Sequence, residues 1–256
     1  MRLSFLGAVI GLLAGGFSGL LVGALIGYGV GLLLTRFLVD GLKVVQSQLV
    51  DSVFAIMGAI CKADNVVTRD EIQAVEQMFN MLNLHGEQRQ QAKEAFNRGK
   101  KADFDLDAAV DQFAGLSRGR GPLVQLFLQM QVMAVAADGR IDPAEHEMLV
   151  RIARRLGLSE ADVSQLEALL RAGTSGPTGA ATAPNRLADA YTALGVTPDS
   201  DAATIKRAYR KLISQNHPDK LAARGLPESM RAVAEERSRE INSAYDLIKS
   251  ARYDVR

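Results

Sequence analysis

The stretch IKRAYRKLISQNHPD, residues 205–219, decides how the C-terminal part of the chain folds. Its apolar residues recur at helical spacing and so predict an amphipathic helix with one face for packing. The tripeptide His217-Pro218-Asp219 ends that helix, because proline lacks the amide proton that a continuing helix needs. The opposite face carries a stripe of four basic residues, Lys206, Arg207, Arg210 and Lys211.

A second helix follows the tripeptide and begins near Pro227. Two amphipathic helices in succession predict an antiparallel pair with His217-Pro218-Asp219 at its shared tip. A short helix that Gly195 ends precedes the pair, and no strand alternation stands out upstream, so we predict an all-α fold. The apolar face of the second helix consists of Met230, Val233, Ala234, Ile241, Ala244, Tyr245 and Ile248.

The order and spacing of several segments resemble the J-domain of the DnaJ family. The loop from Lys220 to Met230, with Gly225-Leu226-Pro227 inside it, looks specifically like that of the membrane-anchored DnaJ-like co-chaperones. The resemblance predicts a J-domain over residues 187–256. The matching segments are Tyr191, Leu194-Gly195-Val196, residues 205–212, His217-Pro218-Asp219 and residues 240–246.

The resemblance implies a partner protein and no catalytic site in the chain itself. J-domains dock on a DnaK-type chaperone and stimulate its ATP hydrolysis, so we expect a co-chaperone that is not an enzyme and needs no cofactor. Asp219 would pair with an arginine of the partner, Pro218 would present it, and His217 would order the loop. The predicted partner-binding residues are His217, Pro218, Asp219, Lys206, Arg207, Arg210, Lys211 and Lys220.

The N-terminal segment predicts a membrane anchor. Residues 3–35 contain no charged side chain, and about 20 apolar residues already cross a bilayer. We therefore predict one transmembrane helix within residues 1–36. Glycines at every fourth position form a smooth ridge that favours a homodimer in lipid, although a glycine-rich span without a partner fits the same pattern. The ridge consists of Gly7, Gly11, Gly15, Gly19, Gly23, Gly27 and Gly31.

The charges that flank this segment do not orient it in the bilayer. Arg2 lies on one side, while Arg36 and Lys43, offset by Asp40, lie on the other. The resemblance supplies the orientation instead, because a DnaK-type chaperone and ATP are found in the cytosol. We expect a single-pass protein of the bacterial inner membrane with its J-domain facing the cytoplasm.

Residues 37–171 predict a helical middle domain with an internal repeat. Residues 63–71 align with residues 137–145, an offset of 74 residues, and each copy predicts helix, tight turn and helix. The turn at Ala137-Asp138-Gly139 resembles the TerB-like fold, an all-helical domain linked to tellurite resistance and stress proteins.

The acidic turns of this repeat allow two interpretations. Thr68 with Glu71, and Asp142 with Glu145, fit capping boxes at the starts of helices. The second turn also fits half of a calcium-binding loop, but alanines would occupy its two leading ligand positions. We therefore predict no metal site. The alternative function is a membrane stress-response scaffold whose TerB-like domain senses a ligand or a metal.

Composition excludes two further possibilities. A formal net charge of +1, with few aromatic residues, argues against nucleic-acid binding. The one cysteine, Cys61, allows no intramolecular disulfide and lies in an apolar run, so we expect it to be buried.

A flexible linker is predicted over residues 172–186. Most of this segment has no charge and no large apolar residue, and it contains glycine and proline. Such a linker would leave the J-domain without a fixed orientation.

Overall fold

The computed structural model describes residues 25–26, 28–30, 47–63, 67–117, 121–138, 141–173, 183–223 and 226–253. Every regular element in these ranges is a helix, which confirms the predicted all-α class for the described part of the chain. The chain divides into two units, Met1–Gln48 and Leu49–Arg256, which we describe separately.

The first unit contains few described residues. Residues 25–26 and 28–30 are helical, and Leu25, Ile26 and Tyr28 are exposed. All seven glycines of the predicted ridge lie outside the described residues. Among the helices that the structure does describe, none is both long and apolar enough to cross a membrane. The transmembrane helix and its homodimer stay predictions.

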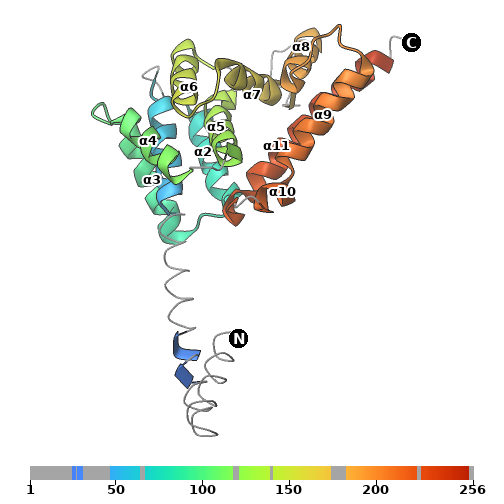
Figure 1. Ribbon diagram of the computed structural model, residues 1–256. Helices are drawn as coiled ribbons and strands as arrows, with labels where there is room; N and C mark the ends of the chain where they lie inside the picture. Colours follow the sequence, from blue (N-terminus) through green and yellow to red (C-terminus); the bar gives the residue numbers. More distant parts are fainter. Residues whose placement is uncertain are drawn as a thin grey trace, which may run out of the picture. The chain divides into compact units, whose positions relative to one another are not determined.

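The second unit begins with the middle domain, which we define as the helices from residue 49 to residue 173. Helix α5 lies among the other helices of this domain (Figure 1). The domain consists of a helical segment at residues 49–60, α2 (Arg69–Met81), α3 (Gly86–Gly99), α4 (Leu106–Leu116), α5 (Gly121–Val135), the 3-10 turn η1 (Ala136–Asp138), α6 (Pro143–Arg155) and α7 (Glu160–Gly173).

Helix α5 holds the core together because it is apolar on nearly all sides. Leu126, Phe127 and Met130 are almost completely buried, as a helix without a polar face requires. The ring of Phe127 stacks on that of Phe113 of α4, with centroids 4.0 Å apart. Cys61 is also buried, which confirms the expectation for it, and burial raises the pKa of its thiol.

Two glycines allow the segment 49–60 and α3 to cross with their backbones in contact. A Cβ atom at Gly58 would lie 2.1 Å from the Phe96 carbonyl oxygen, and one at Gly99 would lie 1.8 Å from that of Ala55. Because real Cβ atoms do not approach so closely, any side chain at either position would force the helices apart.

Both copies of the predicted repeat start a helix with a capping box. The Thr68 amide donates to Glu71 Oε2 at 2.6 Å, and the Asp142 amide donates to Glu145 Oε2 at 2.9 Å. The structural interpretation of the two acidic turns is therefore confirmed at their capping residues. Within the described ranges, no group of three or more His, Cys, Asp or Glu residues is arranged to hold a metal ion.

The C-terminal domain is an antiparallel pair of long helices, α9 and α11, which the shorter helix α8 precedes in the chain. At one end of the pair, Arg252 donates to the Ser200 carbonyl at 2.7 Å, and towards the other end Ser238 donates to the Asn216 carbonyl at 3.3 Å. Residue numbers therefore rise along α9 as they fall along α11, which confirms the predicted pairing. The domain contains α8 (Ala183–Leu194), α9 (Ala202–Asn216), α10 (Pro218–Ala223), the 3-10 turn η2 (Glu228–Met230) and α11 (Arg231–Tyr253).

The C-terminal domain is packed on the middle domain, which differs from the predicted free tether. Ala172 is fully buried in a cluster that α7 shares with α8 and α11. The predicted linker, 172–186, also differs at both ends, because α7 continues to Gly173 and α8 already begins at Ala183. Local composition predicted a coil there, but tertiary packing of α7 against α8 stabilises helix. Residues 174–182 lie outside the described residues.

Candidate partner-binding surface

The tripeptide forms a tight junction between α9 and α10. His217 is extended (φ −63°, ψ 127°) and ends α9, and Pro218 is the first residue of α10, where its missing amide proton costs nothing. The His217 Nδ1 atom accepts a hydrogen bond from the Asp219 amide at 3.3 Å, and the His217 carbonyl accepts one from Leu221 at 3.0 Å. His217 thus orders the start of α10.

Two side chains of the tripeptide face solvent, while the third is buried. The side chain of His217 is 50% exposed and that of Asp219 is 70% exposed, whereas Pro218 is buried. The buried proline fixes the turn, so the carboxylate of Asp219 is presented outward.

Asp219 has a partner within the chain that sequence reasoning missed. Arg231 Nη2, at the start of α11, donates to Asp219 Oδ1 at 3.2 Å. Arg231 also donates to Glu235 at 3.0 Å, and this hydrogen bond to Glu235, with the charge of Asp219, raises the pKa of Arg231. No local sequence pattern predicts a contact between two residues that are twelve positions apart and lie on different helices.

The end of α9 is held by a second residue that sequence reasoning missed. Asn216 is buried, its side-chain amide donates to the Leu212 carbonyl at 2.8 Å, and its own carbonyl accepts from Ser238 of α11. One sequence feature could have indicated this role: Asn216 is a polar residue on the apolar, packing face of an amphipathic helix. These bonds fix where the tripeptide leaves the helix.

The basic stripe leads directly into this junction. All four stripe residues are exposed, and in the part of the chain that the structure describes no ion pair involves any of them. Lys220 of α10 donates to Ser214 near the end of α9, so it lies beside the same helix. The structure therefore brings the predicted stripe, tripeptide and Lys220 together on α9 and α10.

Two family models match the chain, and both fall within the second unit. A model described as tellurite resistance protein TerB matches residues 51–168, and a model described as DnaJ domain matches residues 189–253. The TerB match covers the repeat with its two capping boxes, and the DnaJ match covers the stripe and the tripeptide.

Relatives that align over about four fifths of the chain give the same result. The co-chaperone protein DjlA of Vibrio parahaemolyticus is 42% identical over 224 residues, which cover 81% of this chain and 79% of that protein. The chain belongs to the DjlA family of J-domain co-chaperones. DjlA of Escherichia coli K12 is 38% identical over 215 residues, which cover 77% of this chain and 76% of that protein. No solved structure matches the chain.

Membership of the DjlA family defines the class of this protein as a DnaJ-type co-chaperone, which is a non-catalytic class. In this DjlA-family chain, the C-terminal domain is the J-domain and the middle domain is TerB-like.

Proposed function

We propose that this chain is a membrane-anchored co-chaperone that recruits a DnaK-type chaperone and stimulates its ATPase through His217-Pro218-Asp219. One observation carries the proposal: an exposed stripe without any ion pair in the described chain runs along α9 and ends at an outward-facing carboxylate. Charged side chains that the fold leaves unpaired are free to meet a partner of opposite charge.

The stripe would act first, during encounter. Lys206, Arg207, Arg210 and Lys211 attract an acidic surface over a distance of roughly one Debye length, about 10 Å at 0.1 M salt. Such steering raises the association rate and orients the partner more than it raises affinity.

Asp219 would act next, by exchanging one arginine for another. Its present bond to Arg231 is solvent-exposed, and exposed ion pairs contribute only about 0–1 kcal/mol. An arginine of the chaperone can therefore replace Arg231 at little cost. Within a partly desolvated interface the new pair is stronger, because water no longer competes for it.

The N-terminal segment would decide where this happens. The proposal places residues 1–36 in the bacterial inner membrane as one span, with a homodimer formed along the glycine ridge from Gly7 to Gly31. The J-domain would then face the cytoplasm, where the chaperone and ATP are available.

The test is the ATPase rate of a DnaK-type chaperone with increasing amounts of the full chain in detergent. We expect His217→Gln and Asp219→Asn each to lower the stimulation at least about tenfold, which corresponds to roughly 1.4 kcal/mol of lost coupling. Asp246→Asn is the matched control, since Asp246 is an exposed carboxylate on α11. Full stimulation by either tripeptide variant, with an unchanged helical spectrum, would refute the proposal.

A further inference from the structure

The J-domain and the middle domain share their apolar clusters. Ala168 and Ala172 of α7 belong to the cluster that contains Tyr191 and Ile241 of the J-domain. Conversely, Val233 of α11 belongs to the cluster of the middle domain. Each domain therefore covers apolar surface of the other.

A buried polar network lies inside this interface. Gln129 of α5 is completely buried, and its Nε2 atom donates to Glu240 Oε2 at 2.9 Å. Arg237 Nη1 lies 3.4 Å from both Gln129 Oε1 and the Gln125 carbonyl, while its Nε atom has no hydrogen-bond partner. One neutral amide from the middle domain thus joins two ionisable groups of the J-domain.

Such a network makes the interface weaker than its apolar contacts alone would. Burying an ionisable group costs free energy unless good geometry repays it, and the bonds of Arg237 are long. Helix α5 carries no charged residue that could compensate Glu240 or Arg237. With ionisable groups buried among its apolar contacts, the interface is suited to forming and breaking reversibly.

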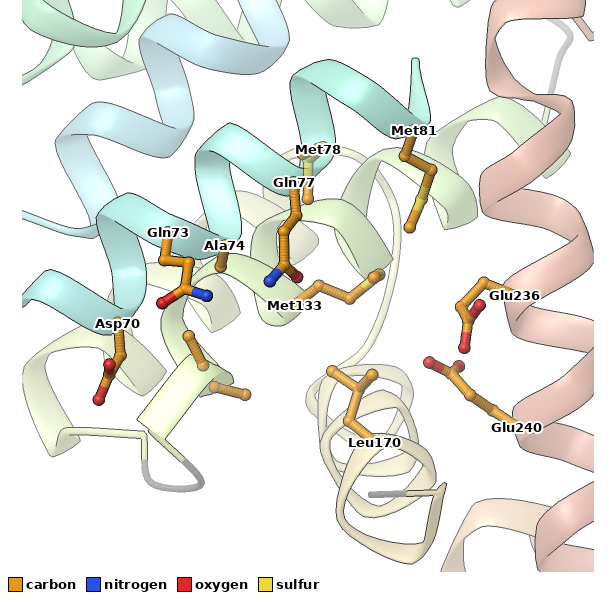
Figure 2. Close-up of a pocket in the computed structure, with 12 residues that line it drawn as sticks. Asp70, Gln73, Ala74, Gln77, Met78, Met81, Met133, Leu170, Glu236 and Glu240 are labelled. Carbon is orange, nitrogen blue, oxygen red and sulfur yellow. The ribbon is translucent and has the colours of Figure 1, made fainter. Parts of the chain in front are cut away.

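One side of the interface is also incompletely filled. A cavity of about 350 Å³ lies beside Glu240, and Met133 and Leu170 form part of its wall. Figure 2 shows Glu236 and Glu240 of α11 directed towards it from the side opposite α2. Open space next to a buried carboxylate gives water a position from which to enter.

A second space brings the basic stripe into contact with the middle domain. A cleft of about 440 Å³ is lined by Lys211 and Gln215 of α9 and by Asp162 and Gln165 of α7. Lys211 is thus at an edge of the stripe that faces an acidic residue of the middle domain. A partner that covers the whole stripe would need this space.

We propose that the packing of the J-domain on the middle domain is a latch. In the closed state Gln129 holds Glu240 and Arg237, and α7 lies along one edge of the stripe. In the open state the chaperone reaches the whole stripe, including Lys211. The effect of the latch on a chaperone rests on the proposed function. The opening and closing of the latch do not, since they can be measured in the absence of a chaperone.

The network also makes the latch sensitive to protons. Burial, followed by the charge of Glu236, raises the pKa of Glu240 from its ordinary value of 4.5 to about 8. Burial lowers the pKa of Arg237 to about 10, so Arg237 changes protonation only in more alkaline solution. Charged groups that face this network are Glu236 and Arg239 on α11, Asp162 on α7 and Asp70 on α2, and α5 contributes none.

The sign of the effect follows from the raised pKa. The closed state holds a proton on Glu240 that the open state, with an ordinary exposed carboxyl, releases above about pH 4.5. Closing therefore weakens as the pH rises from about 4.5 to about 8, by at most tenfold per pH unit for one proton.

The first experiment measures closing by the distance between spin labels at Glu94→Cys of α3 and Ala222→Cys of α10, both exposed positions. Cys61 can stay, because it is buried. From pH 6 to about pH 8 we expect a second, longer distance to appear and grow, and above about pH 8 we expect its share to stay constant. Glu240→Gln should remove this dependence. A single distance at every pH would overturn the latch.

A variant tests the network without a change of pH. Gln129→Leu deprives Glu240 and Arg237 of their amide, so the longer distance should dominate at pH 7. Gln131→Leu is the matched control, since Gln131 is equally buried on the same helix but donates to the Val53 carbonyl inside the middle domain. Equal distances in the two variants would overturn the proposed role of Gln129.

The second experiment holds the latch in its closed state with a disulfide bond between α7 and α11. A Cβ atom at Gly173 would lie 3.7 Å from Glu240 Cβ, within the range of about 3.5–4.5 Å that a disulfide needs. We expect oxidised Gly173→Cys/Glu240→Cys protein to stimulate the chaperone at least about threefold less than the same protein reduced. The two single-cysteine variants should not respond to oxidation.

The outcomes separate the two proposals. If the locked and reduced forms stimulate equally, the latch does not control access and is refuted, while the proposed function stands. If even the unmodified chain fails to stimulate, the proposed function fails, and the distances alone decide whether the latch opens.

Discussion

Two helices of this protein, α6 and α9, each carry a row of basic residues, but only one row is neutralised. On α6, Arg151 donates to Asp107 at 2.8 Å and Arg154 donates to Glu160 at 2.9 Å. On α9, no ion pair within the described residues involves the stripe. The spacing of basic residues is helical in both cases, so sequence pattern alone does not separate them.

The difference lies in what the rest of the fold places opposite each helix. Helix α4 brings Asp107 and Asp111 to within bonding distance of α6, although they precede it by about forty residues. Within the described residues, no carboxylate forms an ion pair with the stripe on α9. We therefore expect a row of basic residues to serve as a docking surface only where tertiary structure leaves it unpaired, and otherwise to stabilise the fold locally.

Reversing charges on both helices should give opposite results, and this is the largest effect we expect. Lys206→Glu with Arg210→Glu should raise the amount of the chain needed for half-maximal ATPase stimulation at least about tenfold, because steering becomes repulsion. The melting temperature should change by less than about 2 °C, because exposed unpaired residues contribute little to stability.

Arg151→Glu with Arg154→Glu is the matched control on α6. It places like charges beside Asp107 and Glu160, so the melting temperature should fall by a few degrees while stimulation stays within about twofold. Equal loss of stimulation in both double variants would remove the distinction between the helices.

Raising the salt concentration should also distinguish the basic residues of α9 from those of α6, by a smaller change in ATPase stimulation. Raising the ionic strength from about 0.1 M to about 1 M shortens the Debye length from about 10 Å to about 3 Å. We expect half-maximal stimulation to require about threefold to tenfold more of the chain at the higher salt. The double variant on α9 should lose this salt dependence, and the one on α6 should keep it.

Supplying α9 with a carboxylate of its own is the mildest change. Ala203→Glu adds a partner one turn before Lys206 and Arg207, and such pairs stabilise a helix by about 0.2–0.5 kcal/mol. Half-maximal stimulation should require about two to three times more of the chain, because part of the stripe is now neutralised. Ala203→Gln keeps the shape without the charge, so a loss of similar size there would contradict this explanation.

Local rules predicted much of the fold. The capping boxes at Thr68 and Asp142 and the break at Pro218 depend on neighbours in sequence, and the structure contains each of them. The antiparallel pair of α9 and α11 followed from two successive helices with apolar faces and the break at the tripeptide between them. The predicted transmembrane helix and its glycine ridge lie outside the described residues and remain predictions.

Contacts between distant segments were not predicted. The bond from Arg231 to Asp219 depends on how the loop between α10 and α11 folds back. The apolar residues of α11 looked like one face, yet Val233 joins the middle domain while Ile248 joins the J-domain cluster. The spacing of apolar residues along a helix indicates which face is buried, but it does not indicate which neighbouring element covers that face.

The sequence by itself determined most of the helices, their caps, the basic stripe and the break at His217-Pro218-Asp219, because hydrogen bonds within one turn and the 3.6-residue period set these features. Only the tertiary structure decided that, within the described residues, the stripe has no ion pair while α6 has several, and that Gln129 meets Glu240 across 111 residues. Both depend on the burial and charge of surfaces that are far apart in the chain, and no local pattern encodes which of them meet.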